Sequence, residues 1–132
     1  MGSEMCIRDS TGAIVIGLGE KVSGVMSNND EVASGLFAAG QSTHERVWQM
    51  PMYEEYGEQL KSHIADLNNI GGRPAGSITA GKFLEHFVGK VPWAHVDIAG
   101  TSFLDKASHY HPQGATGFGV RLMVDYLRSL ES

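Results

Sequence analysis

The feature of this sequence that most limits its fold is the alternation of strand-like and helix-like segments along the chain. TGAIVIGLG holds a short apolar run rich in β-branched residues between glycines, which predicts a buried strand over residues 13–18. VSGVMSN predicts a second strand over residues 22–28. In WAHVDIAG the apolar residues Ala94, Val96 and Ile98 alternate with the residues between them, which predicts a third strand.

Helical spacing separates these strands. In NNDEVASGLFAAG, Asn28 or Asn29 is expected to cap a helix, because their side chains accept hydrogen bonds from the first free backbone N–H groups. Val32, Leu36 and Ala39 then place one apolar stripe along that helix.

The chain closes with GFGVRLMVDYLRSL, which predicts a final helix whose apolar side carries Val120, Val124 and Leu127. Two stretches rich in Gly, Asn and Pro, residues 65–81 and 101–117, are expected to be long loops. Because strands and helices alternate, the fold class is α/β.

Composition excludes two classes of partner. The 132 residues carry a net charge of −5, and no two basic residues adjoin, whereas a nucleic-acid-binding domain normally presents a basic face. No apolar run approaches the roughly 20 residues needed to span a bilayer. Cys6 is the one cysteine and cannot form an internal disulfide, so the cytoplasm is the expected compartment.

Two pairs of residues that contain histidine are candidates for chemistry. His109 and His111, with Asp105 nearby, could chelate a metal, but a zinc site needs a clear third donor, and exposed loop histidines are the favoured interpretation. His95 and Asp97 share one side of a strand, where a carboxylate could orient a general base. Because no nucleophile elbow accompanies them, a hydrogen-bonded histidine within the sheet is favoured.

Two glycine-rich stretches have alternative interpretations. Gly17 and Gly19 follow a predicted strand, but the next glycine falls at Gly24 rather than at the spacing of a dinucleotide fingerprint, so a turn is favoured. In NNIGGRPAG, Arg73 could bind a carboxylate or phosphate, and an ordered turn explains the same residues equally well.

Several motifs occur in an order that identifies a family by resemblance. TGAIVIGLG, VSGVMSNN, RVWQMPMYEEY, ADLNNIGGRPAGSITAGKFLEHFV, WAHVDIAG and GATGFGVRLMVDYL succeed one another along the chain. Together they resemble the C-terminal part of the catalytic domain of the leucyl aminopeptidase (cytosol aminopeptidase) family. The resemblance covers residues 11–130.

The resemblance implies an α/β domain with a mixed sheet flanked by helices. It also implies a cytoplasmic metalloaminopeptidase that removes N-terminal residues from peptide substrates, uses two divalent cations (Mn or Zn) and assembles as a homo-hexamer. The family signature Asn-Thr-Asp-Ala-Glu-Gly-Arg, which carries metal ligands and an assisting arginine, does not occur in this sequence. No catalytic residue, metal ligand or cofactor is therefore carried onto this chain, which is expected to be inactive by itself.

What the resemblance does transfer is part of the wall of the substrate pocket. Thr11, Gly12, Ala99 and Ser102 match positions around the first residue of the peptide, and Ile70 matches a contact to the second. Ser102 stands where the family often has a larger apolar residue. The alternative to a broken enzyme is a non-catalytic binding or assembly domain that keeps the peptidase fold.

The first ten residues, MGSEMCIRDS, differ in character from the rest of the chain. The family has an apolar strand just before the Thr-Gly-Ala motif, whereas this chain has Arg8, Asp9 and Ser10 there. Unpaired charges in a buried strand are costly. Residues 1–10 are therefore expected to be a non-native leader, and residues 11–132 a partial catalytic domain.

Overall fold

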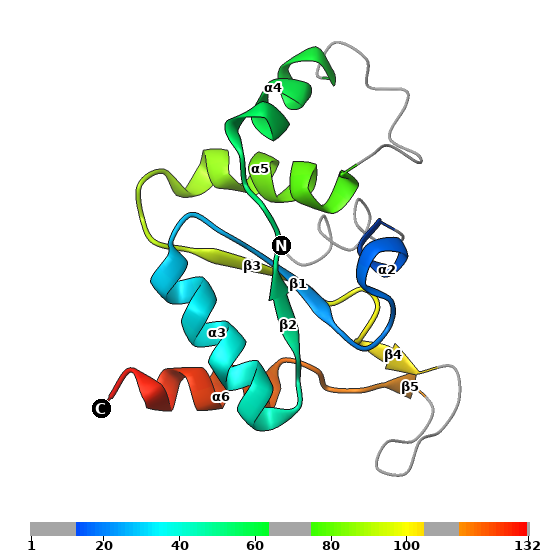
Figure 1. Ribbon diagram of the computed structural model, residues 1–132, viewed down its shortest axis with the longest axis vertical. Coiled ribbons are helices and arrows are strands. Elements are labelled where there is room, and N and C mark those ends of the chain that lie inside the picture. The colour runs from blue at the N-terminus through cyan, green and yellow to red at the C-terminus, as the bar shows by residue number, and fades with distance from the viewer. Residues whose placement is uncertain (1–12, 64–74, 105–113, 132) are drawn as a thin grey trace.

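The computed structural model describes residues 13–63, 75–104 and 114–131 (Figure 1). The elements in these ranges mix helices and strands. They differ from the sequence prediction at residues 13–18, which form a helix, and at residues 76–81, which were expected to belong to a long loop and form the start of another helix. In chain order they are α2 (Ala13–Leu18), β1 (Ser23–Ser27), α3 (Asp30–Thr43), β2 (Val47–Gln49), α4 (Glu54–His63), α5 (Gly76–Val88), β3 (Ala94–Asp97), β4 (Phe103–Leu104), β5 (Gly114–Ala115) and α6 (Val120–Ser129).

The central sheet is mixed and has the order β2-β1-β3. β1 pairs in parallel with β2, with Ser23 opposite Val47, and antiparallel with β3, with Gly24 opposite Asp97. β4 and β5 form a separate antiparallel pair inside the region expected to be a long loop. The α/β class and the mixed sheet with flanking helices are confirmed.

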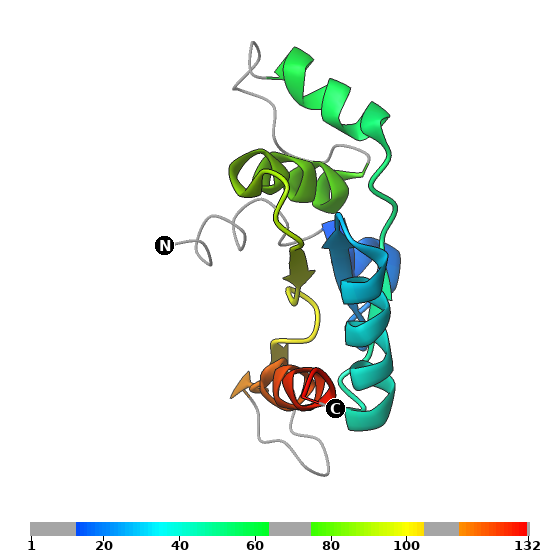
Figure 2. The ribbon, with the colours of Figure 1, turned by 90° about the vertical axis from the view of Figure 1, so that its left-hand side faces the viewer.

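Helices cover both faces of this sheet. On one face, Val25 and Val47 pack with Leu36 of α3 and Leu122 of α6 in the main core cluster. On the other face, Ile14 of α2 lies over β1, and α5 approaches β1 through a glycine. Figures 1 and 2 show α4 beyond α5, at the end of the molecule away from α6.

The expectations for β1, β3 and α3 are confirmed. Asn29 caps α3, because its backbone is extended (φ −139°) and its Oδ1 accepts from the Val32 backbone N–H at 3.1 Å. Leu36 and Ala39 are buried, and Val32 packs against them. The helix ends at His44, which takes the left-handed conformation with φ 60°.

The expected strand over residues 13–18 is wrong, since this segment is the helix α2. A strand would turn Ile14 and Ile16 to the same side, whereas Ile14 is 1% exposed and Ile16 is 89% exposed. Gly19, at φ 72°, ends the helix by donating from its N–H to the Val15 carbonyl at 2.8 Å.

The expected inner side of α6 is also wrong. Val120, Val124 and Leu127 are between 44% and 66% exposed, whereas Leu122 is buried and Tyr126 packs on the core. Among the described helices, none is long and apolar enough to cross a membrane.

Candidate functional site

Two of the predicted pocket residues lie in the turn between β3 and β4. Ala99 and Ser102 are both half-buried there. Thr11, Gly12 and Ile70 lie outside the described residues. The site can therefore be built from this turn and from the segments that contact it.

Backbone hydrogen bonds fix the shape of the turn, which we call the pocket turn (residues 97–102). Asp97 Oδ1 accepts from the Ala99 backbone N–H at 3.1 Å, which is the pattern of an Asx-turn. The Ile98 carbonyl accepts from the N–H groups of Thr101 and Ser102, at 3.0 and 2.9 Å. Asp97 thus starts the turn, and Ile98 closes it.

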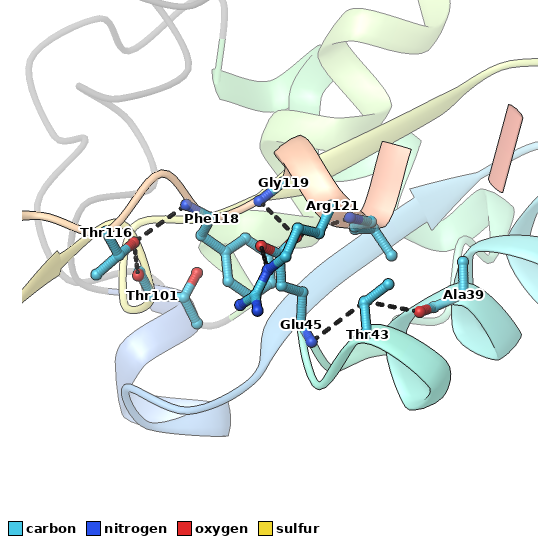
Figure 3. A network of polar contacts seen from close by, with 9 residues as sticks. Ala39, Thr43, Glu45, Thr101, Thr116, Phe118, Gly119 and Arg121 are labelled. Atoms are coloured by element: carbon cyan, nitrogen blue, oxygen red, sulfur yellow. Dashed lines mark hydrogen bonds and ion pairs between the residues drawn. The ribbon is translucent and has the colours of Figure 1, made fainter. Parts of the chain in front are cut away.

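Side chains and backbone from two other segments hold the same turn. Thr101 Oγ1 lies 2.6 Å from Ser23 Oγ at the start of β1, in a buried contact. Thr116 comes directly after β5, and its Oγ1 donates to the Thr101 carbonyl at 2.7 Å (Figure 3). The Thr116 N–H donates to the Ser102 carbonyl at 3.0 Å. The pocket turn is therefore attached both to the central strand and to the segment that leads to α6.

The same turn packs closely on the end of α2. A Cβ at Gly100 would lie 2.5 Å from the Gly19 carbonyl oxygen and 3.2 Å from Val15 Cγ2, so only glycine allows this approach. A Cβ at Gly76, the first residue of α5, would lie 3.2 Å from Ala13 Cβ. Helix α2 therefore contacts both the pocket turn and the start of α5.

Two of the elements in this arrangement lie close in sequence to predicted pocket residues that the structure does not describe. α2 begins directly after Gly12 in the sequence, the pocket turn carries Ala99 and Ser102, and α5 comes after the 64–74 segment that contains Ile70. The contacts that the structure describes are those of α2 with the pocket turn and with the start of α5. The pocket wall itself stays a prediction, because Thr11, Gly12 and Ile70 lie outside the described residues.

The pair His95 and Asp97 lies in β3, where Asp97 begins the pocket turn. Burial lowers the pKa of His95, and the negative charge of Asp97 partly opposes that shift. The neutral form of His95 is accordingly favoured near pH 7. The Asp97 Oδ1 atom binds the Ala99 N–H, so this carboxylate shapes the pocket turn. His109, His111 and Arg73 lie outside the described residues.

The described residues do not supply a metal centre. Within residues 13–63, 75–104 and 114–131, no group of three or more His, Cys, Asp or Glu side chains could hold a metal ion. The donor set for the two cations implied by the resemblance is thus not found in this part of the chain.

A hollow among the described residues is lined by none of the residues of the pocket turn. It has a volume of about 720 Å³ and lies at the carboxyl ends of β1 and β2. Lys82 of α5 lines it, with its ammonium 2.9 Å from Glu85 and 3.8 Å from Glu54. The lysine side chain is 6% exposed, and its charge is balanced by these carboxylates. None of the predicted pocket residues that the structure describes lines this hollow.

Sequence reasoning missed the residues that hold the pocket turn. The Asx-turn of Asp97 has a local signal, an aspartate two residues before a turn amide. Ser23 and Thr101 are 78 positions apart, and Thr116 has no pattern of its own that points to the turn. No local signal could have revealed these contacts.

Comparison with known proteins gives a consistent family. The family model of the cytosol aminopeptidase catalytic domain matches residues 8–124. The Geobacter sulfurreducens "Probable cytosol aminopeptidase" is 55% identical over 119 residues, which is 90% of this chain and 24% of that protein. The protein of the same name from Protochlamydia amoebophila is 53% identical over 121 residues, covering 91% of this chain and 24% of its own length.

A solved structure shares the fold. The bottromycin maturation enzyme BotP, in complex with Mn, superposes with a TM-score of 0.80 at 33% sequence identity, over 91% of this chain and 27% of its own. This chain spans about a quarter of the length of the relatives it matches. On the family match and these identities, the chain belongs to the cytosol aminopeptidase family and corresponds to part of its catalytic domain.

Proposed function

We propose that this chain is the C-terminal part of the catalytic domain of a metal-dependent leucyl aminopeptidase, which removes N-terminal residues from peptides. The observation that carries the proposal is the pocket turn, where Ala99 and Ser102 are held in one fixed shape against α2. A pocket for a side chain needs such a rigid wall. The family match supports the peptidase activity of the full-length parent.

In this proposal the chain supplies a wall of the substrate pocket and the parent supplies the chemistry. Thr11, Gly12, Ala99 and Ser102 would face the first residue of the peptide, and Ile70 would contact the second. The parent would bind two divalent cations, Mn or Zn, and assemble as a cytoplasmic homo-hexamer. Support for a divalent metal comes from the structural neighbour, which was solved with Mn.

The isolated chain is proposed to be inactive, since its sequence lacks the signature that carries metal ligands and the assisting arginine. The test is an assay of the chain on leucine p-nitroanilide with Mn²⁺ or Zn²⁺ added. No release of nitroaniline above the buffer rate is expected. Turnover well above that rate would overturn the proposal of inactivity.

A chimaera tests whether the chain contributes a working wall. Residues 11–130 of this chain would replace the matching segment of the Geobacter sulfurreducens relative, which is 55% identical. The expected result is metal-dependent hydrolysis of leucine p-nitroanilide. A folded, metal-loaded chimaera without activity, beside an active Geobacter parent, would refute the proposed function.

A second candidate is a non-catalytic domain that keeps the fold for assembly. The observation that favours it is the exposed apolar stripe of α6, formed by Val120, Met123, Val124, Leu127 and Leu130. Sequencing the locus upstream of Met1 separates the two candidates. A reading frame that continues through the missing signature supports the enzyme and a non-native leader at residues 1–10, whereas a promoter and start codon at Met1 support the short protein.

A further inference from the structure

The side chain of Thr101 is buried in the protein. Thr101 is 7% exposed and sits between the two pocket residues Ala99 and Ser102. Its hydroxyl lies 2.6 Å from Ser23 Oγ and 3.3 Å from the Ile98 carbonyl oxygen. Both contacts are satisfied when Ser23 donates to Thr101 and Thr101 donates to Ile98.

Ser23 is a rigid anchor for this contact. It is 1% exposed, begins the central strand β1, and pairs opposite Val47 of β2. Its backbone N–H donates to the Arg46 carbonyl at 3.1 Å. The sheet therefore fixes the position of Ser23, and the contact between the Ser23 and Thr101 hydroxyls attaches the pocket turn to the sheet.

The backbone of Thr101 is held from the other side. Thr116 Oγ1 donates to the Thr101 carbonyl at 2.7 Å and accepts from the Phe118 N–H at 3.2 Å (Figure 3). Thr101 is thus the residue of the pocket turn that both the sheet and the β5 segment contact. Ala99 has no polar side chain of its own with which to fix its position.

We propose that Thr101 is a positioning residue, whose hydroxyl holds the wall formed by Ala99 and Ser102 at the distance that selects the first side chain of the peptide. The proposal rests on the proposed function, since it assumes that these two residues line the pocket. Thr101 acts through its neighbours and does not touch the substrate. Removing its hydroxyl leaves Ser23 Oγ buried without its partner, and the turn must move to accommodate it.

The test uses the chimaera with the Geobacter relative and compares two substrates, leucine and alanine p-nitroanilide. Thr101→Val removes the hydroxyl but keeps the volume, whereas Thr101→Ser keeps the hydroxyl. Thr79→Val is the matched control, because the Thr79 hydroxyl donates locally to the Ala75 carbonyl, at the start of α5. The readout is the ratio of kcat/KM for leucine to kcat/KM for alanine.

This ratio separates positioning from stability, because a smaller folded fraction lowers both kcat/KM values by the same factor. In Thr101→Val the ratio is expected to fall roughly fivefold. This is the change in the ratio that corresponds to losing the net free energy of one hydrogen bond. In Thr101→Ser and Thr79→Val the ratio should stay within about twofold of the parent chimaera. An unchanged ratio in Thr101→Val overturns the positioning role.

Two further measurements keep the proposal testable if Thr101→Val does not fold or the chimaera is inactive. Ser23→Ala removes the same contact from the other side, and its ratio should fall in the same direction. In the chain itself, hydrogen exchange at the Ala99 and Ser102 amides should accelerate in Ser23→Ala, and unchanged exchange would refute the anchoring. An inactive parent chimaera would refute the proposed function. An active chimaera in which Thr101→Val and Ser23→Ala both leave the leucine-to-alanine ratio of kcat/KM unchanged would refute only the positioning role.

Discussion

The carboxylate of Glu45 holds the beginning of α6, and its replacement tests how this part of the fold is stabilised. Glu45 lies between α3 and β2 and is 4% exposed. Its Oε2 accepts from the backbone N–H groups of Gly119 and Leu122, at 3.0 and 2.8 Å (Figure 3). Its Oε1 accepts from Arg121 Nε at 3.2 Å. α6 has no side-chain cap of its own, so Glu45 supplies one from more than 70 positions away.

The size of the expected effect comes from these contacts. Each backbone hydrogen bond to a charged group contributes about 1.5 kcal/mol or more, so the two bonds to Oε2 contribute about 3 kcal/mol. The Arg121 side chain is 62% exposed, and its ion pair is screened to below about 1 kcal/mol. Glu45→Ala should therefore lower the free energy of unfolding by about 3 kcal/mol. Glu45→Gln keeps one oxygen that can accept from both N–H groups but removes the negative charge, and because bonds to a charged group are roughly twice as strong as neutral ones, it should cost about half of that.

Urea unfolding monitored by far-UV circular dichroism and tryptophan fluorescence measures these differences. Arg121→Ala is the matched control for the exposed ion pair, and it should cost less than about 1 kcal/mol. Glu131→Ala, an exposed carboxylate in the same region, should change stability by less than about 0.5 kcal/mol. The capping argument is refuted if Glu45→Ala costs no more than Arg121→Ala.

Three further predictions concern other parts of the molecule. Burial lowers the pKa of His95, so as the pH falls the unfolded chain is protonated at this histidine before the folded chain is, and the free energy of unfolding decreases between about pH 7 and pH 5. His95→Gln should make the urea midpoint depend less steeply on pH over this range. The same pH dependence in both proteins would contradict this role of His95. Gly100→Ala forces a Cβ to 2.5 Å from a backbone oxygen and should cost about 2–3 kcal/mol in thermal unfolding. Gly57→Ala, whose nearest contact is 3.9 Å, should instead stabilise α4 by up to about 1 kcal/mol. Val124→Glu should reduce self-association in size-exclusion chromatography without loss of helix, whereas Leu122→Glu should unfold the chain.

The sequence allowed those elements to be predicted whose signals are local. The cap at Asn29 lies three residues from the amide that it accepts from, and the alternation of β3 is contained in a few residues. Helix α2 was not predictable in this way, because a short apolar run suits a strand and a helix equally. The helix packs closely on Gly24 and Gly100, which lie outside the run itself, so its tertiary contacts could not be read from the run.

The candidate site likewise has features with a local sequence signal and contacts between distant segments that have none. Ala99 and Ser102 came from a resemblance in sequence motifs, and the Asx-turn of Asp97 could have been inferred from neighbouring residues. The contacts of Thr101 with Ser23 and Thr116 join three separate segments. Such contacts are set by the packing of the sheet against the turn, and periodicity carries no information about them.

The helix α6 was predicted correctly, but the apolar side expected from its sequence is not the side that packs on the core. It has two apolar sides, one with Leu122 and Tyr126 and one with Val120, Val124 and Leu127. Periodicity favours the larger stripe, but the cap fixes the rotation of the helix, because Glu45 binds the Leu122 N–H and so places this turn against the core. The larger stripe is left exposed among the residues that the structure describes, and contiguous exposed apolar side chains of this kind mark interaction surfaces.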